Sequence, residues 1–254
     1  MRLNVGSWFA STKRECPICG RDASQGASAA AAVPIPIRHP APKRALASLC
    51  GLCRQAIPWI VHPVCRVCGR AESCEDCIRR TQRSYAISRC AVRYTDGMKD
   101  WLALYKYRGN EGVELILAAM LAFALERLQA ATSQTSFPII TAVPLASERL
   151  RERGFNQAER LACRLAEWYG MAYRPLLHRR RHTEKQSLKT RRSRVVDMRG
   201  NFAAVSTASF SGNIILLDDV YTTGSTLDEC ARVLRQASEP QAESRVYGLL
   251  WARS

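Results

Sequence analysis

Residues 214–226 constrain the fold of this 254-residue chain more than any other stretch. They read Ile-Ile-Leu-Leu, then Asp218 and Asp219, then Val-Tyr-Thr-Thr-Gly-Ser-Thr. Four consecutive apolar residues are typical of a strand buried on both faces, and the Thr/Gly/Ser run is typical of a loop that opens a helix. Ligands of open α/β sheets bind beyond the carboxyl ends of the strands. The stretch therefore predicts an α/β fold and places a candidate ligand site after this strand.

The same junction has the chemistry of a site for a phosphorylated sugar. A helix N-terminus offers unpaired N–H groups and a positive partial charge, which suit a phosphate. Gly224 lets the backbone approach the anion closely, and the neighbouring hydroxyls are further donors: Thr222, Thr223, Ser225 and Thr226. Two adjacent carboxylates repel a phosphate but accept hydrogen bonds from sugar hydroxyls. The alternative is a plain strand end followed by a helix N-cap; the Rossmann and P-loop signatures are absent from the sequence.

The rest of residues 81–254 alternates strand and helix patterns. Apolar residues at helical spacing predict helices over residues 96–108, 113–129, 156–169 and 223–236. Short apolar runs predict strands over residues 85–94, 138–143, 202–205, 213–217 and 245–250, and residues 191–199 are a candidate short helix. Strands separated by helices require crossover connections, so the pattern predicts a wound, mostly parallel sheet.

Eight of the eleven cysteines lie in four Cys-x-x-Cys pairs before residue 78. In a chain without a convincing secretion signal, such pairs indicate a metal rather than disulfides. Zinc takes four thiolates in a tetrahedron, so two pairs make one structural site. The simplest grouping is sequential and a crossed grouping stays open, as do a redox dithiol and an iron–sulfur cluster. We therefore expect two zinc sites, one from Cys16, Cys19, Cys50 and Cys53 and one from Cys65, Cys68, Cys74 and Cys77.

Residues 1–80 are expected to form this cysteine-rich double zinc-ribbon module, followed by the α/β domain over residues 81–254. The module is interrupted by residues 23–42, which are rich in Ala, Ser and Pro, show no helical or strand period and predict a flexible loop. Two of the pairs are followed by glycine, Gly20 and Gly69, because a tight turn around the thiolates favours a positive φ. A segment this small has too little core to fold without metal.

Charge and hydropathy narrow the class of protein further. The formal net charge is +16, which favours polyanionic partners such as pyrophosphate, nucleotides or nucleic acid. The longest apolar run, residues 113–128, contains Glu114 and Glu126 and is shorter than the ~20 residues that span a bilayer. The first residues lack the apolar core of a signal peptide. We expect a cytoplasmic protein without membrane insertion; the sequence does not indicate an oligomeric state.

Several further blocks occur in a fixed order along the chain. They are Leu-Tyr-Lys-Tyr-Arg-Gly at residues 104–109, Val-Pro-Leu at 143–145, Arg-Gly-Phe-Asn-Gln at 153–157 and Gln-Ser-Leu-Lys-Thr-Arg-Arg at 186–192 leading to Phe202. Together with the cysteine pairs and residues 214–226, they resemble the ComF family of competence-associated, type I phosphoribosyltransferase-like proteins. The resemblance covers about residues 45–254, and the Ala/Pro-rich insert before Cys50 departs from a compact module.

The resemblance implies a type I phosphoribosyltransferase-like fold that binds phosphoribosyl pyrophosphate (PRPP) with Mg²⁺. In that family pattern, Asp218 and Asp219 hold the ribose 2′- and 3′-hydroxyls, and residues 222–226 cradle the 5′-phosphate. The upstream blocks and the basic loop supply candidate pyrophosphate contacts: Lys106, Pro144, Arg149, Arg153, Arg191 and Arg192. Mg²⁺ suits these oxygen ligands. The implied activity is transfer of phosphoribosyl to an acceptor that the sequence does not name, in association with DNA uptake during natural transformation.

The alternative function is a non-catalytic adaptor that keeps the PRPP fold and binds single-stranded DNA of the uptake machinery. Residues 178–199 hold nine Lys or Arg against two acids, more cations than one pyrophosphate needs. That run contains no Phe, Tyr or Trp, and single-strand binding without sequence preference normally uses stacked aromatics. Trp59 or Tyr107 would have to supply the stacking, or the guanidinium planes themselves. The sequence therefore predicts weak, salt-sensitive DNA binding through phosphate contacts.

Overall fold

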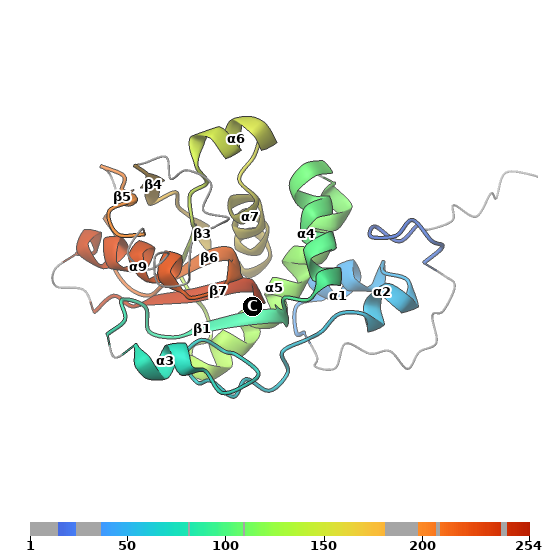
Figure 1. Cartoon of the computed structure of the whole chain (residues 1–254), viewed down its shortest axis with the longest axis horizontal. Helices are drawn as coiled ribbons and strands as arrows, with labels where there is room; N and C mark the ends of the chain where they lie inside the picture. The colour runs from blue at the N-terminus through green and yellow to red at the C-terminus, as the bar shows by residue number, and fades with distance from the viewer. Residues whose placement is uncertain are drawn as a thin grey trace, which may run out of the picture.

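A computed structural model describes residues 15–23, 37–80, 82–108, 110–180, 198–206, 209–239 and 243–254 of the protein. Its centre is a five-stranded sheet in the order β1-β7-β6-β2-β3, and every pair of neighbours in it is parallel (Figure 1). The strands are β1 (Ser88–Arg93), β2 (Ile139–Ala142), β3 (Ala172–Tyr173), β6 (Ile214–Tyr221) and β7 (Val246–Arg253). The wound, mostly parallel sheet expected from the sequence is confirmed.

Strand β6 is central, as its unbroken apolar run requires. Ile214 pairs with Ile139 of β2 on one side and with Val246 of β7 on the other. Alternate side chains enter different cores, since Ile215 and Leu217 pack on one face of the sheet and Ile214 and Leu216 on the other. A strand that buries both faces in this way reads as a continuous apolar run.

Helices cover both faces of the sheet. One face carries α5 (Glu111–Thr132) and α7 (Gln157–Tyr169), and the other carries α9 (Ser225–Ala237). Helix α4 (Asp96–Arg108) follows β1 and has the bounds predicted from the sequence. Helix α5 is long and apolar enough to cross a membrane by length and composition alone, but most of that window is buried inside the protein. The burial of α5 identifies it as a core helix.

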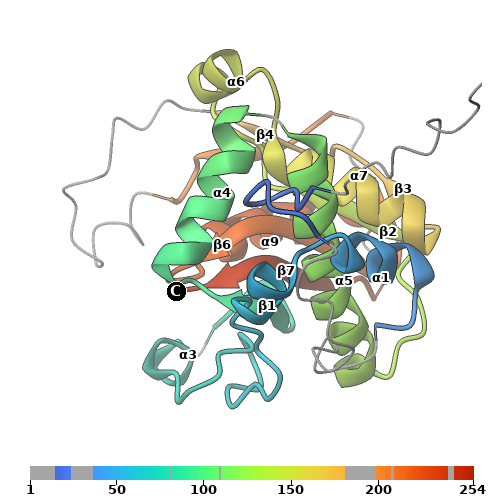
Figure 2. The ribbon, with the colours of Figure 1, turned by 90° about the vertical axis from the view of Figure 1, so that its right-hand side faces the viewer.

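Three short helices belong to the cysteine-rich segment: α1 (Pro40–Ala47), α2 (Gly51–Gln55) and α3 (Glu75–Arg79). Helix α1 begins inside residues 23–42, for which the sequence predicted a loop without helical period. Pro40 stands at the first helical position, where its missing N–H costs nothing, and the ring of His39 accepts a bond from the Ala41 N–H. Figure 2 shows α1 lying against α5, where Leu46 is buried. The tertiary contact, rather than a sequence period, stabilises this helix.

A second, small sheet stands beside the first. It pairs β4 (Leu177–Arg179) antiparallel with β5 (Phe202–Ala204). Helix α6 (Ser147–Arg153) follows β2, and together with α4 it rises above the main sheet in Figure 1. The sequence predicted neither α6 nor β4, and most of the short helix expected over residues 191–199 lies outside the described residues. Helices α4 and α6 and the small sheet of β4 and β5 surround the end of β6 and so delimit the candidate site.

Candidate functional site

The two aspartates lie inside β6 rather than after it. The sequence predicted a strand ending at Leu217, but β7 continues alongside and extends the ladder, with Asp218 opposite Leu250 and Val220 opposite Ala252. Each carboxylate folds back onto the chain, because Asp218 Oδ1 accepts from the Asp219 N–H at 2.9 Å and Asp219 Oδ1 accepts from the Val220 N–H at 2.7 Å. The strand and these bonds fix both carboxylates at the carboxyl edge of the sheet.

Lys106 of α4 is the cation of this site. Its Nζ lies 2.6 Å from Asp219 Oδ2, and the two side chains are each 20% exposed. Burial acts to raise the pKa of Asp219, but Lys106 outweighs it and holds that pKa below its usual range. Burial and the neighbouring Asp219 charge raise the pKa of Asp218 to about 8. Burial and the Asp219 charge thus favour a proton on the pair, whereas Lys106 favours one charge on it.

Arg153 faces the pair from the last turn of α6. Its guanidinium also lowers the pKa of Asp219, by less than Lys106 does. The guanidinium lies 5.9 Å from the ring centre of Tyr107. One of its nitrogens, Nη1, is buried and has no hydrogen-bond partner among the described residues. A buried guanidinium nitrogen without a partner is costly unless an acceptor occupies the space before it. Arg153 Nη1 can therefore donate to an anionic oxygen of a ligand at the candidate site.

The remaining predicted cation and loop positions are on α6, at the end of β2 and at the start of α7. Arg149 is an exposed residue of α6, and Pro144 follows the end of β2. Asn156 caps α7 with its side-chain oxygen and donates from Nδ2 to the Val143 carbonyl at 3.1 Å, so it fixes the turn between β2 and α7. Arg191 and Arg192 lie outside the described residues.

The sequence missed Arg179 as a member of this site. It lies on β4, and its guanidinium interacts electrostatically with both Arg149 and Asp218. Burial and Arg149 lower the pKa of Arg179, whereas Cys230 and Asp218 raise it. From the sequence it was grouped with the basic run and with DNA. No local signal marked it, because β4 is placed by contacts with distant segments: it pairs with β5, and the preceding Leu176 N–H donates to Thr141 of β2.

The loop between β6 and α9 is closed by its own contacts. Gly224 caps α9 in the left-handed region, at φ 77°, and a Cβ there would collide with the Tyr221 ring. Thr223 and Ser225 are buried and their hydroxyls bond each other at 2.7 Å, whereas Thr222 is exposed. The Thr226 hydroxyl lies 3.8 Å from the Met198 sulfur. A phosphate at this helix N-terminus would therefore meet backbone N–H groups and Thr222 first, and would exchange the Thr223–Ser225 bond for its own.

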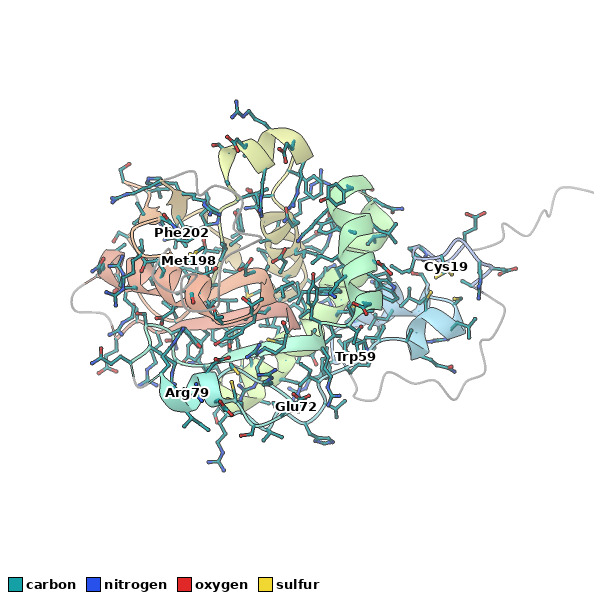
Figure 3. All side chains as sticks on the ribbon, in the orientation of Figure 1. Cys19, Trp59, Glu72, Arg79, Met198 and Phe202 are labelled. Carbon is teal, nitrogen blue, oxygen red and sulfur yellow. The ribbon has the colours of Figure 1, made fainter. Side chains whose placement is uncertain are left out.

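The eight paired cysteines form two clusters with the sequential grouping. The first holds Cys16, Cys19, Cys50 and Cys53, the second holds Cys65, Cys68, Cys74 and Cys77, and within each cluster the sulfurs lie within 4.8 Å of one another. Gly20 and Gly69 have positive φ, at 72° and 71°, as their places after the pairs predicted. Figure 3 shows the clusters on different sides of the molecule, with Cys19 beyond α2 and Arg79 near the second cluster.

The sulfur positions fit zinc. Cys19 and Cys50 lie 3.7 Å apart and Cys68 and Cys74 lie 3.6 Å apart. Tetrahedral zinc with Zn–S bonds of ~2.3 Å separates its sulfurs by about 3.8 Å. Burial acts to raise the pKa of Cys74, but hydrogen bonds from the Cys77 N–H and from neighbouring side chains bring it to about 7. Both clusters can hold a metal ion with four ligands and little rearrangement.

Comparison with known proteins identifies relatives over most of the chain, although no protein-family model matches it. Competence protein ComFC of Bacillus subtilis is 33% identical over 209 residues, which are 77% of this chain and 81% of that protein. Competence protein ComFC of Streptococcus pneumoniae is 30% identical, over 74% of this chain and 82% of that protein. DNA utilization protein YhgH of Salmonella typhi is 29% identical, over 73% and 90%.

One solved structure, the allosteric regulatory enzyme of purine biosynthesis, is also similar in part. It is 20% identical with a TM-score of 0.30, and the match covers 51% of this chain. The chain spans about a quarter of that structure's length, since the match covers 24% of it. The strand order and register of this chain, rather than that similarity, define its fold.

Proposed function

This chain belongs to the ComF family, and from that premise we propose that it binds PRPP with Mg²⁺ and transfers the phosphoribosyl group to an acceptor. The single observation that carries the proposal is the carboxylate pair of β6, with Lys106 Nζ 2.6 Å from Asp219 and Arg153 facing the pair. Two acids suit the ribose hydroxyls, and the unpartnered Arg153 nitrogen suits a phosphate oxygen. The cytoplasmic site of action expected from the sequence is part of the proposal.

The proposed roles follow from position. Asp218 and Asp219 accept hydrogen bonds from the ribose hydroxyls, and the N-terminus of α9 binds the 5′-phosphate. Lys106 and Arg153 face the pyrophosphate, whose charge grows as the bond from C1 to its oxygen breaks. Mg²⁺, when bound, would neutralise part of that charge. The acceptor forms the new bond to C1 and releases its proton to solvent, so the chain needs no nucleophile of its own, and positioning with charge stabilisation supplies the catalysis.

Release of pyrophosphate tests the transferase proposal. Thermal-shift measurements with PRPP and Mg²⁺ establish binding, and pyrophosphate release is then followed with a panel of bases, nucleosides and DNA as acceptors. The proposal expects release that depends on one class of acceptor and is lost in Lys106→Gln. Binding of PRPP without release against every acceptor would indicate an adaptor rather than a transferase.

An arginine-rich surface favours a second function, binding of single-stranded DNA. A cleft of about 630 Å³ beside α9 is lined by five arginines, Arg80, Arg83, Arg199, Arg232 and Arg235. A neighbouring cleft of about 430 Å³ shares two of them, Arg83 and Arg235, and adds Arg245. Two acids of the larger cleft are already engaged, because Glu229 binds Arg232 and the Gly200 N–H, and Asp228 binds the Ser84 N–H. The two clefts share Arg83 and Arg235, and their six arginines outnumber their three acids, Asp228, Glu229 and Glu243, a balance that suits a phosphate backbone.

Aromatic stacking is limited on this surface. Trp59 packs edge-on against Phe123 at 4.9 Å and is part of the core, whereas Tyr107 is 78% exposed near the carboxylate pair.

Fluorescence anisotropy with a labelled oligonucleotide across a salt series tests whether the basic surface binds DNA. Changing Arg83 and Arg235 to Gln is expected to flatten the log–log slope by about 0.7 for each lost phosphate contact. An unchanged slope would exclude the basic surface as the DNA site.

A further inference from the structure

Arg253, the last residue of β7, joins the second cysteine cluster to the ligand loop. It is only 4% exposed. Its Nη1 donates to the Tyr221 carbonyl at 3.2 Å and to the Thr222 carbonyl at 2.9 Å, so one nitrogen holds the backbone at the start of the loop. Its Nη2 lies 3.7 Å from Cys74 Sγ and 3.9 Å from an Asp76 oxygen. The guanidinium also lies 4.5 Å from the Tyr221 ring centre.

Arg253 Nη2 lies closer to the Cys74 sulfur than to the Asp76 carboxylate, and Nη1 also donates to the Ser254 carbonyl. A buried guanidinium is costly without a counter-charge, and its carboxylate contact to Asp76 is long, at 3.9 Å. Zinc held by four thiolates carries a net charge of about −2, and one of these thiolates is the Cys74 sulfur. A filled cluster therefore places more negative charge beside Arg253 than an empty cluster does.

Residues that follow the second cluster make further contacts with the same loop. Arg80 Nη1 lies 3.4 Å from the Gly224 carbonyl, and the Ser84 N–H donates to Asp228 at 2.8 Å. The Tyr85 and Tyr221 hydroxyls bond each other at 2.8 Å. The first cluster packs elsewhere, since Cys16 and Cys50 lie in the core that contains α5. Among the described residues, contacts to the loop come from the neighbours of the second cluster, from Arg253 and Ser254, and from Met198.

We propose that Arg253 is a positioning residue through which zinc in the second cluster holds the loop at residues 221–226 in its ligand-binding geometry. The inference rests on the proposed function for the identity of the ligand, but the coupling itself does not require that ligand. Partners of a metal ligand that orient their surroundings typically change affinity or activity about 10–100-fold when removed. Loss of zinc from the second cluster is then expected to weaken ligand binding.

Amide hydrogen exchange of the full-length, zinc-loaded protein measures the coupling without any ligand. Arg253→Gln keeps all eight thiolates but loses both the charge and the loop contacts. We expect its amides in residues 221–228 to exchange about tenfold faster than in wild type while zinc content stays the same. Arg93→Gln, at an exposed arginine opposite Arg253 on β1, is the matched control and leaves this exchange unchanged.

Loss of metal from one cluster at a time completes the test. Cys77→Ser is expected to speed exchange at residues 221–228, and Cys19→Ser to leave it unchanged. Arg253→Lys keeps the charge with a single donor group and is expected to lie between wild type and Arg253→Gln. Unchanged loop exchange in Arg253→Gln, or equal effects of Cys77→Ser and Cys19→Ser, would overturn the coupling.

Titration with PRPP and Mg²⁺ separates failure of the coupling from failure of the proposed function. If the loop responds to Arg253→Gln but wild-type protein does not bind PRPP, the coupling stands and the proposed ligand is wrong. If wild-type protein binds PRPP and Arg253→Gln binds it with equal affinity and equal loop exchange, the proposed function stands and the coupling is wrong. A loss of affinity of about tenfold together with faster loop exchange supports both.

Discussion

The two cysteine clusters have the same ligands and the same Cys-x-x-Cys spacing, yet they support different parts of the molecule. The first joins pairs separated by 30 residues of sequence and packs with α1 and α5, in a different core from the ligand loop. The second joins pairs separated by 5 residues and shares a core with Tyr221 and Leu227, at the two ends of that loop. The same four-cysteine arrangement therefore packs against a core helix in the first cluster and beside the candidate ligand loop in the second.

The difference arises from what each cluster has as a neighbour. Glu126 of α5 accepts bonds from the N–H groups of Arg38 and His39, so the first cluster's segment is held to a core helix. The second cluster lies next to the carboxyl ends of β6 and β7, where Arg253 and Tyr221 face each other in the sheet register. The carboxyl edge of a parallel sheet is where ligands bind, so a cluster placed there acts on the site.

The largest expected effect separates the clusters by stability. Cys74→Ser removes a buried ligand and leaves Arg253 without its counter-charge, so we expect one zinc to be lost and Tm to fall by about 10 °C or more. Cys19→Ser, at an exposed ligand, is expected to lower Tm by about half as much. Elemental analysis of protein purified without chelator, with differential scanning calorimetry, measures both. Iron in place of zinc, or eight freely titrating thiols in wild type, would contradict the metal assignment.

The next effect concerns pH on the ligand side of the molecule. Burial raises the pKa of Asp218 from 3.8 to about 8, so the folded protein keeps a proton that the unfolded chain loses above about pH 4. The unfolded chain then binds fewer protons, and the free energy of unfolding falls as pH rises from about 4 to about 8, by less than about 1.4 kcal/mol per pH unit. Urea unfolding of wild type and of Asp218→Asn across this range measures it. A wild-type slope that survives in Asp218→Asn would assign the titration to another group.

A smaller effect tests the coupling in the reverse direction. Because coupling between two binding sites is reciprocal, a ligand held by the loop must also stabilise zinc in the second cluster. We expect PRPP with Mg²⁺ to slow chelator-driven release of one zinc several-fold and to leave release of the other unchanged. A chromogenic chelator followed over time resolves the two phases. Equal protection of both zinc ions would indicate general stabilisation of the fold.

The smallest effect compares one hydroxyl on each side. Near the second cluster, the Tyr85 and Tyr221 hydroxyls bond each other at 2.8 Å. Near the first cluster's segment, the Tyr169 hydroxyl donates to Glu126 Oε1 at 2.8 Å. Changing either to Phe removes one hydrogen bond, and each is expected to cost about 1 kcal/mol of unfolding free energy. Only Tyr85→Phe is expected to speed amide exchange at residues 221–228. Faster loop exchange in Tyr169→Phe would remove the distinction between the two sides.

The sequence predicted the elements that are determined locally. Helix α4 has the predicted bounds because Met98, Trp101 and Tyr105 recur at helical spacing and are all buried. The positive φ of the two glycines after cysteine pairs followed from turn geometry. Zinc's need for four ligands predicted two sites but left the grouping open between a sequential and a crossed one, and the structure has the sequential one. Asp218 and Asp219 stood out because a buried strand and a helix N-terminus seldom enclose two adjacent acids without a ligand that donates hydrogen bonds to them.

The contacts between distant segments could not be predicted in this way. Strand β7 was expected to end at Leu250, so Arg253 fell outside every predicted element, and its contact with Cys74 spans 179 residues of sequence. Arg179 is brought near Asp218 by the β4–β5 pairing and by the bond from Leu176 to Thr141 of β2. The position of Arg253 follows once the strand order is known, because the last residue of β7, the strand beside β6, must lie at the edge of the sheet where ligands bind.

Calorimetric titration of PRPP with Mg²⁺ into wild-type protein and into Asp219→Asn tests the central claim, that the carboxylate pair of β6 binds the ribose. Asp219→Asn removes a charged acceptor and the Lys106 ion pair, and charged hydrogen bonds are worth about 1.5–3 kcal/mol. We predict binding by wild type at submillimolar PRPP and an affinity about 10–150-fold lower in the variant, with Tm and zinc content retained. Wild-type protein that gives no heat with millimolar PRPP and Mg²⁺, or a variant that binds as tightly as wild type, would contradict the claim.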